Sequence, residues 1–364
     1  MRVAVVGAGV IGALIAYRLA CHDVEVILID RAEPGAGTSG KTFSWLNSNE
    51  KRPREYYELN LAGLRAHLRL REEFERTPWL HSGGNLEWAG DAETRQCLAD
   101  RVERLRSWGY DVQWMTAEQV NARLEPELSL PNGNSHIAYF PEEGWIDAVA
   151  FARHFADLAA GRGARCEFGV AVTEISRSER LTAVRIGDAD PVRVDAVVNA
   201  AGASADEVAA LAGTSLPLAP TSGLLVRLSA EGTTLGRVVH APGVNLRPDG
   251  PDNILLHHDS VDERMWHGEP EQALAAELVE RTHRVLPTLR GRAVIDTRVG
   301  VRPMPADGLP SIGRLSSLPG YYEAVTHSGA TLAPAIADAL TEEILTGEVT
   351  PLAAPFSADR LPRP

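Results

Sequence analysis

The stretch RVAVVGAGVIGALIAYRLACHDVEVILID, residues 2–30, decides the fold of this chain. It contains an apolar run, a glycine-rich turn, a helical pattern and a second apolar run that stops at a carboxylate. The first apolar run is residues 2–6, the turn residues 7–12, the helical pattern residues 13–20, and the second apolar run residues 24–29, with the carboxylate at Asp30. This order predicts a Rossmann-type βαβ unit that binds the ADP part of a dinucleotide. Asp30 would accept hydrogen bonds from a ribose 2′-hydroxyl and would repel a 2′-phosphate.

The three glycines of the turn have separate tasks. Gly7 allows a tight turn, Gly9 lets the backbone approach a pyrophosphate, and Gly12 lets the helix pack closely on the sheet. At the start of the helix, Val10 and Ile11 offer N–H groups to the anion. A glycine-rich turn in another kind of α/β protein is the alternative, but the complete strand–turn–helix–strand–acid order favours the cofactor.

The composition is that of a globular protein of about two domains. The chain has 364 residues, of which 44% are hydrophobic and 23% charged. Its formal net charge of −13 argues against nucleic acid and against anionic membranes as partners, since both need a basic surface. Of the 36 basic residues only Lys41 and Lys51 are lysines.

The cysteine pattern indicates a reducing compartment. Cys21, Cys97 and Cys166 are scattered and have no C-x-x-C spacing, so they suggest neither a disulfide framework nor a zinc site. The apolar character of residues 1–20 belongs to the glycine fingerprint rather than to a signal peptide, and no other run is long enough to span a bilayer. We therefore expect a cytoplasmic protein.

Helical and strand patterns alternate along the rest of the chain. Residues 56–76 form a long helical pattern in which Leu59, Leu64, Leu68 and Phe74 can share one face. Further helices are predicted at residues 92–108, 148–162, 270–285 and 333–345, and another begins at Thr116. Strands are predicted at residues 79–88, 166–175, 181–186 and 192–198, followed by short strands with turns over residues 221–258.

Three further segments accompany the fingerprint. They are residues 35–47 (GAGTSGKTFSWLN), residues 195–203 (DAVVNAAGA), and a C-terminal group at residues 300–303, 307–313 and 326–334. With the fingerprint, these segments resemble the D-amino-acid-oxidase-like family of FAD-dependent oxidoreductases, which includes glycine oxidase and sarcosine oxidase. The resemblance spans the whole chain, although residues 84–140 contribute little.

The resemblance implies an α/β fold, α+β overall. A Rossmann-like FAD-binding domain is expected beside a discontinuous second domain that is built on an antiparallel, mainly β sheet. The FAD-binding domain would comprise residues 1–83, 141–219 and 299–364, and the substrate domain residues 84–140 and 220–298.

The resemblance also implies a set of cofactor-binding residues. The hydroxyl and N–H groups of Thr38 and Ser39 would face phosphate, and the helix that opens at residues 328–331 would direct its positive end at the flavin pyrimidine. A solvated loop, and a core strand with a tight exit turn, are the alternatives for the two middle segments. The expected set is Gly7, Gly9, Val10, Ile11, Gly12, Asp30, Arg31, Thr38, Ser39, Lys41, Thr42, Val172, Ala200, Ala201, Gly202, Arg302, His327, Ser328, Gly329, Ala330, Thr331 and Leu332.

Arg302 is the side chain most closely tied to substrate. The resemblance places it where amine-oxidising members bind the substrate carboxylate, and a guanidinium matches a carboxylate with two parallel hydrogen bonds. A structural arginine at a strand end is the alternative. His240, Asn245, Arg247 and His257 lie on alternating positions of an expected hairpin on the substrate side.

These hairpin residues are weaker candidates for catalysis. Arg247 could pair with an acid instead, and a histidine is more often structural than catalytic. The run His257-His258-Asp259 does not make a metal site, since adjacent strand side chains point to opposite faces; no metal is expected.

Two departures from the family shape the expected chemistry. Members that bind FAD covalently use a cysteine near the Arg302 segment, which this chain lacks, so FAD is expected to be non-covalent. Sarcosine-oxidising members use a lysine on the substrate side, but no lysine follows Lys51. Lys41 could take that role only if its loop reaches the flavin. The electron acceptor could therefore be either oxygen or another compound.

The sequence predicts an enzyme that oxidises a C–N bond of an amino acid or related carboxylated amine by hydride transfer to FAD. A nicotinamide-dependent dehydrogenase would explain the first thirty residues but not the C-terminal segments. A flavin-binding redox protein without its own small substrate is a further alternative. The substrate, its stereochemistry and the oligomeric state stay open.

Overall fold

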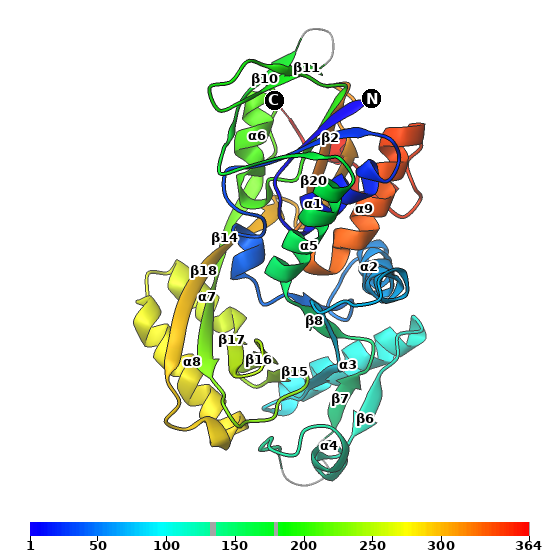
Figure 1. The fold of residues 1–364 in the computed structure, drawn as a ribbon. Helices are drawn as coiled ribbons and strands as arrows, with labels where there is room; N and C mark the ends of the chain where they lie inside the picture. Colours follow the sequence, from blue (N-terminus) through cyan, green and yellow to red (C-terminus); the bar gives the residue numbers. More distant parts are fainter. Residues whose placement is uncertain (132–135, 178–180, 364) are drawn as a thin grey trace.

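The computed structural model describes residues 1–131, 136–177 and 181–363. Its upper part in Figure 1 is built on a six-stranded sheet of order β19-β20-β13-β1-β2-β9, in which only the β19–β20 pair is antiparallel. The strands are β1 (Arg2–Val6), β2 (Glu25–Asp30), β9 (Arg165–Phe168), β13 (Ala196–Asn199), β19 (Ser311–Arg314) and β20 (Tyr321–Val325). The predicted Rossmann-like fold is confirmed.

The fingerprint folds as a βαβ unit whose glycines meet close backbone contacts. Gly7 has φ +107°, a conformation that glycine adopts without strain, and a Cβ there would lie 2.3 Å from the carbonyl oxygen of Ala200. A Cβ on Gly12 would lie 1.9 Å from the carbonyl oxygen of Gly7. Helix α1 (Val10–Ala20) begins three residues earlier than its apolar pattern alone predicted, because the fingerprint itself supplies the first turn.

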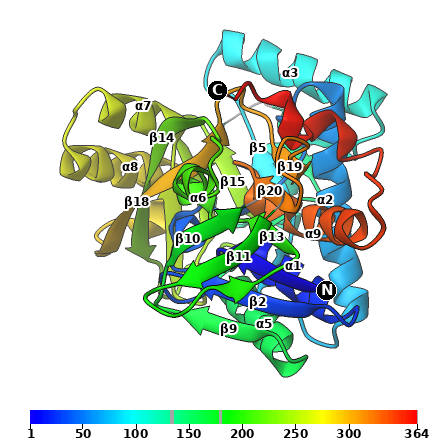
Figure 2. The ribbon, with the colours of Figure 1, turned by 90° about the horizontal axis from the view of Figure 1, so that it is seen from above.

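Helices cover both faces of this sheet (Figures 1 and 2). On one face α1 packs against α5 and α9, and α9 packs against α2. The other face carries α6 and a three-stranded sheet of β10, β11 and β12. The helices are α2 (Arg54–Glu73), α3 (Ala92–Ser107), α4 (Ala117–Arg123), α5 (Ala148–Gly161), α6 (Ala205–Leu211), α7 (Asp259–Trp266), α8 (Glu271–Val285) and α9 (Gly329–Thr346).

A second, eight-stranded sheet forms the lower part of the molecule, with the order β18-β14-β17-β16-β15-β5-β7-β6. All its pairs are antiparallel except β5–β15. The strands are β5 (Asn85–Glu87), β6 (Gln113–Met115), β7 (Ile137–Phe140), β14 (Leu218–Ser229), β15 (Val238–Ala241), β16 (Val244–Pro248), β17 (Asn253–His257) and β18 (Val294–Pro305). Residues from both predicted insertions therefore share one sheet.

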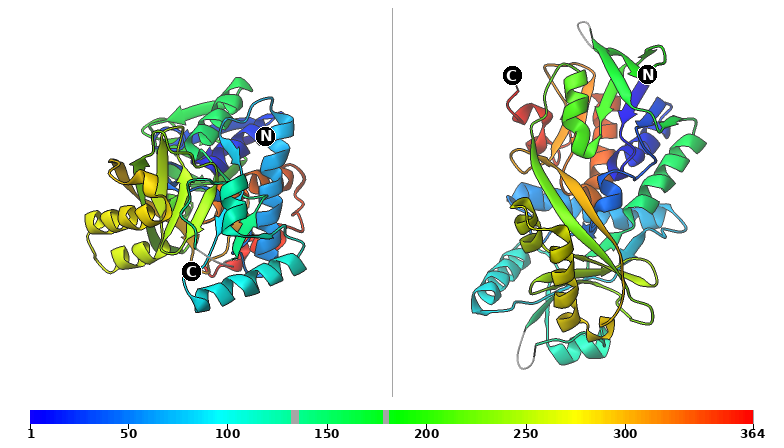
Figure 3. Two further views of the ribbon diagram at one scale, coloured as in Figure 1. Left: turned by 90° about the horizontal axis from the view of Figure 1, so that it is seen from below. Right: turned by 90° about the vertical axis from the view of Figure 1, so that its left-hand side faces the viewer.

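Two long strands link the upper and lower parts. β14 and β18 pair in antiparallel fashion from Leu218–Pro305 to Leu228–Val294, and the right-hand view of Figure 3 shows them running between the two parts. A small sheet of β3 (Trp45–Leu46), β8 (Gly144–Ile146) and β4 (Leu80–Ser82) lies beside the junction. One apolar cluster fills one side of the upper part and continues to α3 and β7, and another packs on the lower sheet.

Several elements differ from the sequence prediction. Helices α6 and α7 were not predicted. The helical pattern of residues 333–345 missed the first turn of α9, but the expected opening of this helix at residues 328–331 is confirmed, and Pro334 lies within it. Leu68 was placed on the buried face of the long helix, but it is 37% exposed because the inward-facing positions are filled by residues such as Leu64 and His67. Among the described residues, no helix is both long enough and apolar enough to cross a membrane.

Candidate cofactor and substrate site

Two adjoining cavities lie between the sheets. The smaller, of about 160 Å³, follows the glycine turn, and the larger, of about 950 Å³, extends into the lower part. They share the wall residues Thr38, Thr42, Pro303, His327 and Ala330. A single elongated ligand can therefore run from one cavity into the other.

The smaller cavity gathers most of the predicted cofactor residues. They come from the βαβ unit, the 38–42 segment, the end of β13 and the start of α9. They are Gly7, Gly9, Val10, Ile11, Asp30, Arg31, Thr38, Ser39, Thr42, Ala200, Ala201, Gly202, His327, Gly329 and Ala330.

Asp30 and Ser39 fix the backbone of the glycine turn. One Asp30 carboxylate oxygen accepts the N–H of Ala8 at 2.7 Å, and the other accepts the N–H of Ala32 at 2.9 Å. The Ser39 hydroxyl accepts the N–H of Val10 at 3.2 Å, at the positive end of α1. These bonds use the N–H groups of Ala8 and Val10 and hold the turn in place, and its small residues leave room for an anionic group at the positive end of α1.

Four other predicted cofactor residues line the larger cavity: Lys41, Arg302, Ser328 and Thr331. Three lie in neither wall. Gly12 packs on the glycine turn, Val172 is 8% exposed in β10, and Leu332 is fully buried in α9.

The start of α9 is held by two side chains from α2. Tyr56 and Ser328 share a hydrogen bond of 2.7 Å between their hydroxyls. Pro334 has no N–H, so the carbonyl of Ala330 lacks its usual helical donor. The Nε2 of buried His67 lies 2.8 Å from that oxygen and supplies the missing hydrogen bond. Burial lowers the pKa of His67 to about 4, which keeps the ring neutral in this donor role.

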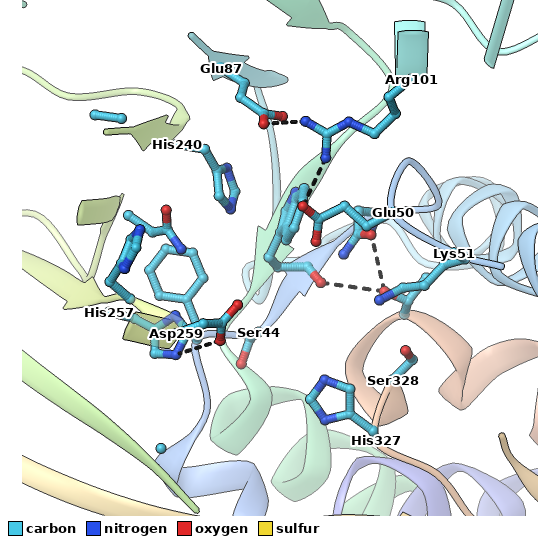
Figure 4. Close-up of a pocket in the computed structure, with 18 of the residues that line it drawn as sticks. Ser44, Glu50, Lys51, Glu87, Arg101, His240, His257, Asp259, His327 and Ser328 are labelled. Carbon is cyan, nitrogen blue, oxygen red and sulfur yellow. Dashed lines mark hydrogen bonds and ion pairs between the residues drawn. The ribbon is translucent and has the colours of Figure 1, made fainter. Parts of the chain in front are cut away.

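Both lysines of the chain line the larger cavity. Lys41 ends the short 3₁₀ turn Thr38–Lys41, and Lys51 lies beside His327 and Ser328 in Figure 4. The side chain of His327 is exposed to the cavity, yet surrounding protein lowers its pKa to about 3, with smaller contributions from Lys51 and Arg302. His327 is therefore neutral at ordinary pH.

The predicted hairpin residues form one cross-strand row. Asn245 on β16 pairs in register with His240 on β15 and with His257 on β17, and all three line the larger cavity. The Nδ1 of His240 lies 2.7 Å from the amide oxygen of Asn85, and burial lowers the pKa of His240 to about 3.

Arg247 lies outside the cavity wall. It is 5% exposed, its Nε donates to the carbonyl of Phe43, and its Nη1 donates to Asp249 at 3.2 Å. Arg247 thus pairs with an acid, as its alternative interpretation required. Its bond to Phe43 anchors the loop that contains Phe43 to the hairpin.

Arg302 lies within a group of acidic and imidazole side chains. Its Nη2 donates to the carboxylate of Asp262 and lies 2.9 Å from Nε2 of His257 and 3.6 Å from the carboxylate of Asp259. The potential ligand atoms of His257, Asp259 and Asp262 all lie within 4.8 Å of one another, which is a spacing that can suit a metal ion. The guanidinium already places a cation among them, so the cluster is an ion-pair network.

A second ion-pair network on the opposite wall was missed by sequence reasoning. Arg101 on α3 donates to Glu87 and, at 2.8 Å, to Glu50, and Figure 4 shows this chain of charges above His240. Glu87 and Arg101 lie within residues 84–140, where the family resemblance contributed little, and Glu50 lies just after the segment 35–47, so no motif marked them.

A buried carboxylate supports the loop that carries Trp45 and Lys51. Glu143 is fully buried and accepts hydrogen bonds from Trp45 at 2.9 Å, Asn49 at 2.9 Å and Tyr110 at 2.8 Å. Burial raises the pKa of Glu143 to about 8, although these donors oppose the shift.

The raised pKa predicts a pH-dependent stability. Glu143 binds its proton more tightly in the folded chain, so its contribution to stability is present at low pH and is lost as the pH rises from the ordinary carboxyl value to about 8. Urea denaturation of the wild type and of Glu143→Gln should show the wild type losing stability relative to the variant across this window. Parallel pH profiles for the two proteins would contradict the assignment.

The site has the features of a flavin site. Glycines in the wall at Gly7 and Gly9, the positive end of α1, and shared walls with a second cavity that faces the start of α9 all suit an elongated dinucleotide. The fold and the site together define a dinucleotide-dependent oxidoreductase with a separate substrate chamber.

The family model described as FAD dependent oxidoreductase matches residues 2–343. The chain belongs to this family and is an FAD-dependent enzyme, which confirms the sequence-based resemblance and cofactor.

Individual relatives cover nearly the whole chain. Glycine oxidase of Geobacillus kaustophilus is 26% identical, with 98% of this chain and 96% of the relative aligned. A Rhizobium etli protein with the provisional name thiamine biosynthesis oxidoreductase ThiO is 30% identical, over 96% of this chain and 98% of its own. The crystal structure of the Geobacillus glycine oxidase superposes with a TM-score of 0.86 at 25% identity and covers 99% of both chains.

Proposed function

We propose that this enzyme oxidises the C–N bond of an amino acid or a related amine that carries a carboxylate. The observation that carries the proposal is Arg302, whose guanidinium lines the larger cavity together with the first residues of α9. The resemblance to glycine oxidase over the full chain supports the same chemistry. The substrate domain would comprise residues 84–140 and 220–298, and the FAD-binding domain the remainder.

The residues of the cavity orient the substrate rather than react with it. Arg302 binds the carboxylate through planar, charge-assisted hydrogen bonds, which fixes the α-carbon. FAD, when bound, supplies the hydride acceptor. The positive end of α9 favours negative charge close to Ser328 and Gly329.

The neutral histidines limit the acid–base chemistry of the chamber. His240 and His327 both have pKa values of about 3, so neither carries a proton that it could give to the amine at ordinary pH. The amine then enters the reaction in its neutral form, and turnover rises with pH as the substrate amine loses its proton.

An anaerobic reduction screen tests the proposed function. The purified holoenzyme is mixed with a panel of amino acids and secondary amines, and flavin absorbance is followed. At least one carboxylated amine should bleach the flavin, whereas the matching amine without a carboxylate should bleach it far more slowly. Failure of every carboxylated amine would refute the proposal. A colourless protein reduced only with a nicotinamide would instead support the dehydrogenase alternative.

The electron acceptor and the attachment of FAD are further parts of the proposal. Either oxygen or another acceptor can reoxidise the flavin, and peroxide formed on admitting oxygen identifies an oxidase. FAD is proposed to be non-covalent, because the Arg302 segment has no cysteine; Cys97 does line the larger cavity, on α3. Acid precipitation should release the flavin into the supernatant.

The free cysteines support a cytoplasmic location, and the charge of −13 supports the absence of a nucleic-acid or membrane partner.

A further inference from the structure

A fully buried carboxylate stands behind the substrate-binding arginine. Asp262 is 0% exposed, and one of its oxygens accepts the N–H of Leu224 at 2.8 Å. The other oxygen accepts from Nη2 of Arg302 and lies 3.0 Å from Nε2 of His257. Helix α7, which presents Asp262, is thereby tied to β14, β17 and β18 at one point.

The pair of Asp262 and Arg302 is a fixed part of the protein. A buried carboxylate that loses its cation is strongly destabilising, because no water replaces the lost partner. An arriving substrate carboxylate therefore does not displace Asp262. Among the described residues, Nε and Nη1 of Arg302 have no protein partner, so N–H donors on two edges of the guanidinium remain for a ligand in the cavity.

Gly223 lies directly against the ion pair of Asp262 and Arg302. It pairs with Gly300 in the β14–β18 register, and a Cβ on Gly223 would lie 2.7 Å from Nη2 of Arg302 and 2.9 Å from the bonded oxygen of Asp262. Only a residue without a side chain leaves room for the ion pair at this point. The guanidinium is thus held by a hydrogen bond on one side and by backbone on another.

We propose that Asp262 is a positioning residue that holds Nη2 of Arg302 as a clamp and leaves the remaining N–H donors of the guanidinium to bind the substrate carboxylate in a fixed orientation. The proposal rests on the proposed function. Because Asp262 neutralises the charge of Arg302, orientation rather than excess charge governs the use of carboxylated substrates. Loss of the clamp should lower kcat, since a misoriented α-carbon reacts slowly, while KM changes little because the freed guanidinium charge still attracts the anion.

Asp262→Asn tests the clamp with almost no change in size. The side-chain amide of the variant has a single oxygen. If that oxygen accepts the N–H of Leu224, the NH₂ group must face Nη2 of Arg302, and the two donor groups repel each other. For a carboxylated amine, kcat should fall about tenfold or more while KM changes less than about threefold. The matching amine without a carboxylate should lose much less.

Asp259→Asn is the matched comparison. Asp259 lies at the start of the same helix and 3.6 Å from the same nitrogen, but its side chain is 75% exposed, so solvent screens it. Its variant should lose clearly less kcat than Asp262→Asn. Gly223→Ala keeps both charged groups and pushes them apart, and it should reproduce the kcat loss of Asp262→Asn. Unchanged kcat in Asp262→Asn, or an equal loss for both amines, would overturn the proposal.

A stability measurement separates this proposal from the proposed function. Thermal unfolding of Asp262→Asn, Arg302→Met and the double variant, each measured as the holoenzyme, requires no substrate. A clamped pair predicts that the double variant melts higher than the sum of the two single losses implies. Additive losses would show that the pair does not act as a unit and would refute the clamp. If no amine reduces the wild-type flavin but the losses are non-additive, the proposed function fails while the pair stands.

Discussion

Arg302→Lys is expected to lower kcat/KM for carboxylated amines about 100-fold, which corresponds to about 2.7 kcal/mol. A lysine keeps the positive charge beside Asp262, so the buried carboxylate remains paired. It cannot offer the planar fork of donors, and it therefore loses the bidentate contact with a substrate carboxylate. The loss should appear in both KM and kcat, because the fork binds the carboxylate and also orients the α-carbon, whereas Asp262→Asn should affect mainly kcat. Steady-state kinetics of the holoenzyme measure both constants.

Arg302→Lys is a sharper variant than Arg302→Ala. Removing the cation would leave the fully buried Asp262 unpaired, at a cost of about 3–5 kcal/mol, so a loss of activity could follow from unfolding alone. The control is the same amine without its carboxylate, whose kcat/KM should change little in Arg302→Lys. Equal losses for both amines would mean that Arg302 does not bind the carboxylate.

Gly7→Ala is expected to yield a protein that retains little or no FAD. The new Cβ would lie 2.3 Å from the carbonyl oxygen of Ala200, and an alanine is strained at the φ of +107° found here. Relief of the clash must move the turn away from β13 and so deform the wall of the smaller cavity. Flavin content after purification, from the ratio of flavin to protein absorbance, measures the effect.

Gly161→Ala provides the matched control. Gly161 ends α5, and no atom lies within 4 Å of a Cβ built there, so the same chemical change meets open space. This variant should keep its flavin and unfold at a temperature equal to or slightly above that of the wild type. A flavin content of Gly7→Ala equal to that of Gly161→Ala would show that the glycine turn tolerates a side chain.

The Rossmann-like fold and the FAD cofactor could be predicted from the sequence because their signals are local. Gly7, Gly12 and Asp30 lie within one βαβ unit, and each is required by a contact inside that unit or with the neighbouring strand. The row of His240, Asn245 and His257 could also be anticipated, since strand alternation puts such residues on one face.

The substrate half depends on contacts that no local pattern encodes. Asp262 lies on a helix that was not predicted, and its burial against Arg302 follows from the docking of α7 on β14. Arg101 belongs to a charged helix whose surface residues look alike in sequence, yet it alone bridges Glu50 and Glu87 in the cavity wall. Arg247 has the same residue type as Arg302 but is held by Phe43 and Asp249 instead.

The confinement of both lysines to one cavity has a practical consequence for labelling. Arginine supplies 34 of the 36 basic side chains, so the only side-chain amines are those of Lys41 and Lys51. A reagent selective for amines therefore meets the N-terminus and this chamber and nothing else along the chain. The NMR signals of a fluorine or isotope tag introduced by such chemistry would report on the larger cavity, because the only other tagged group would be the N-terminus.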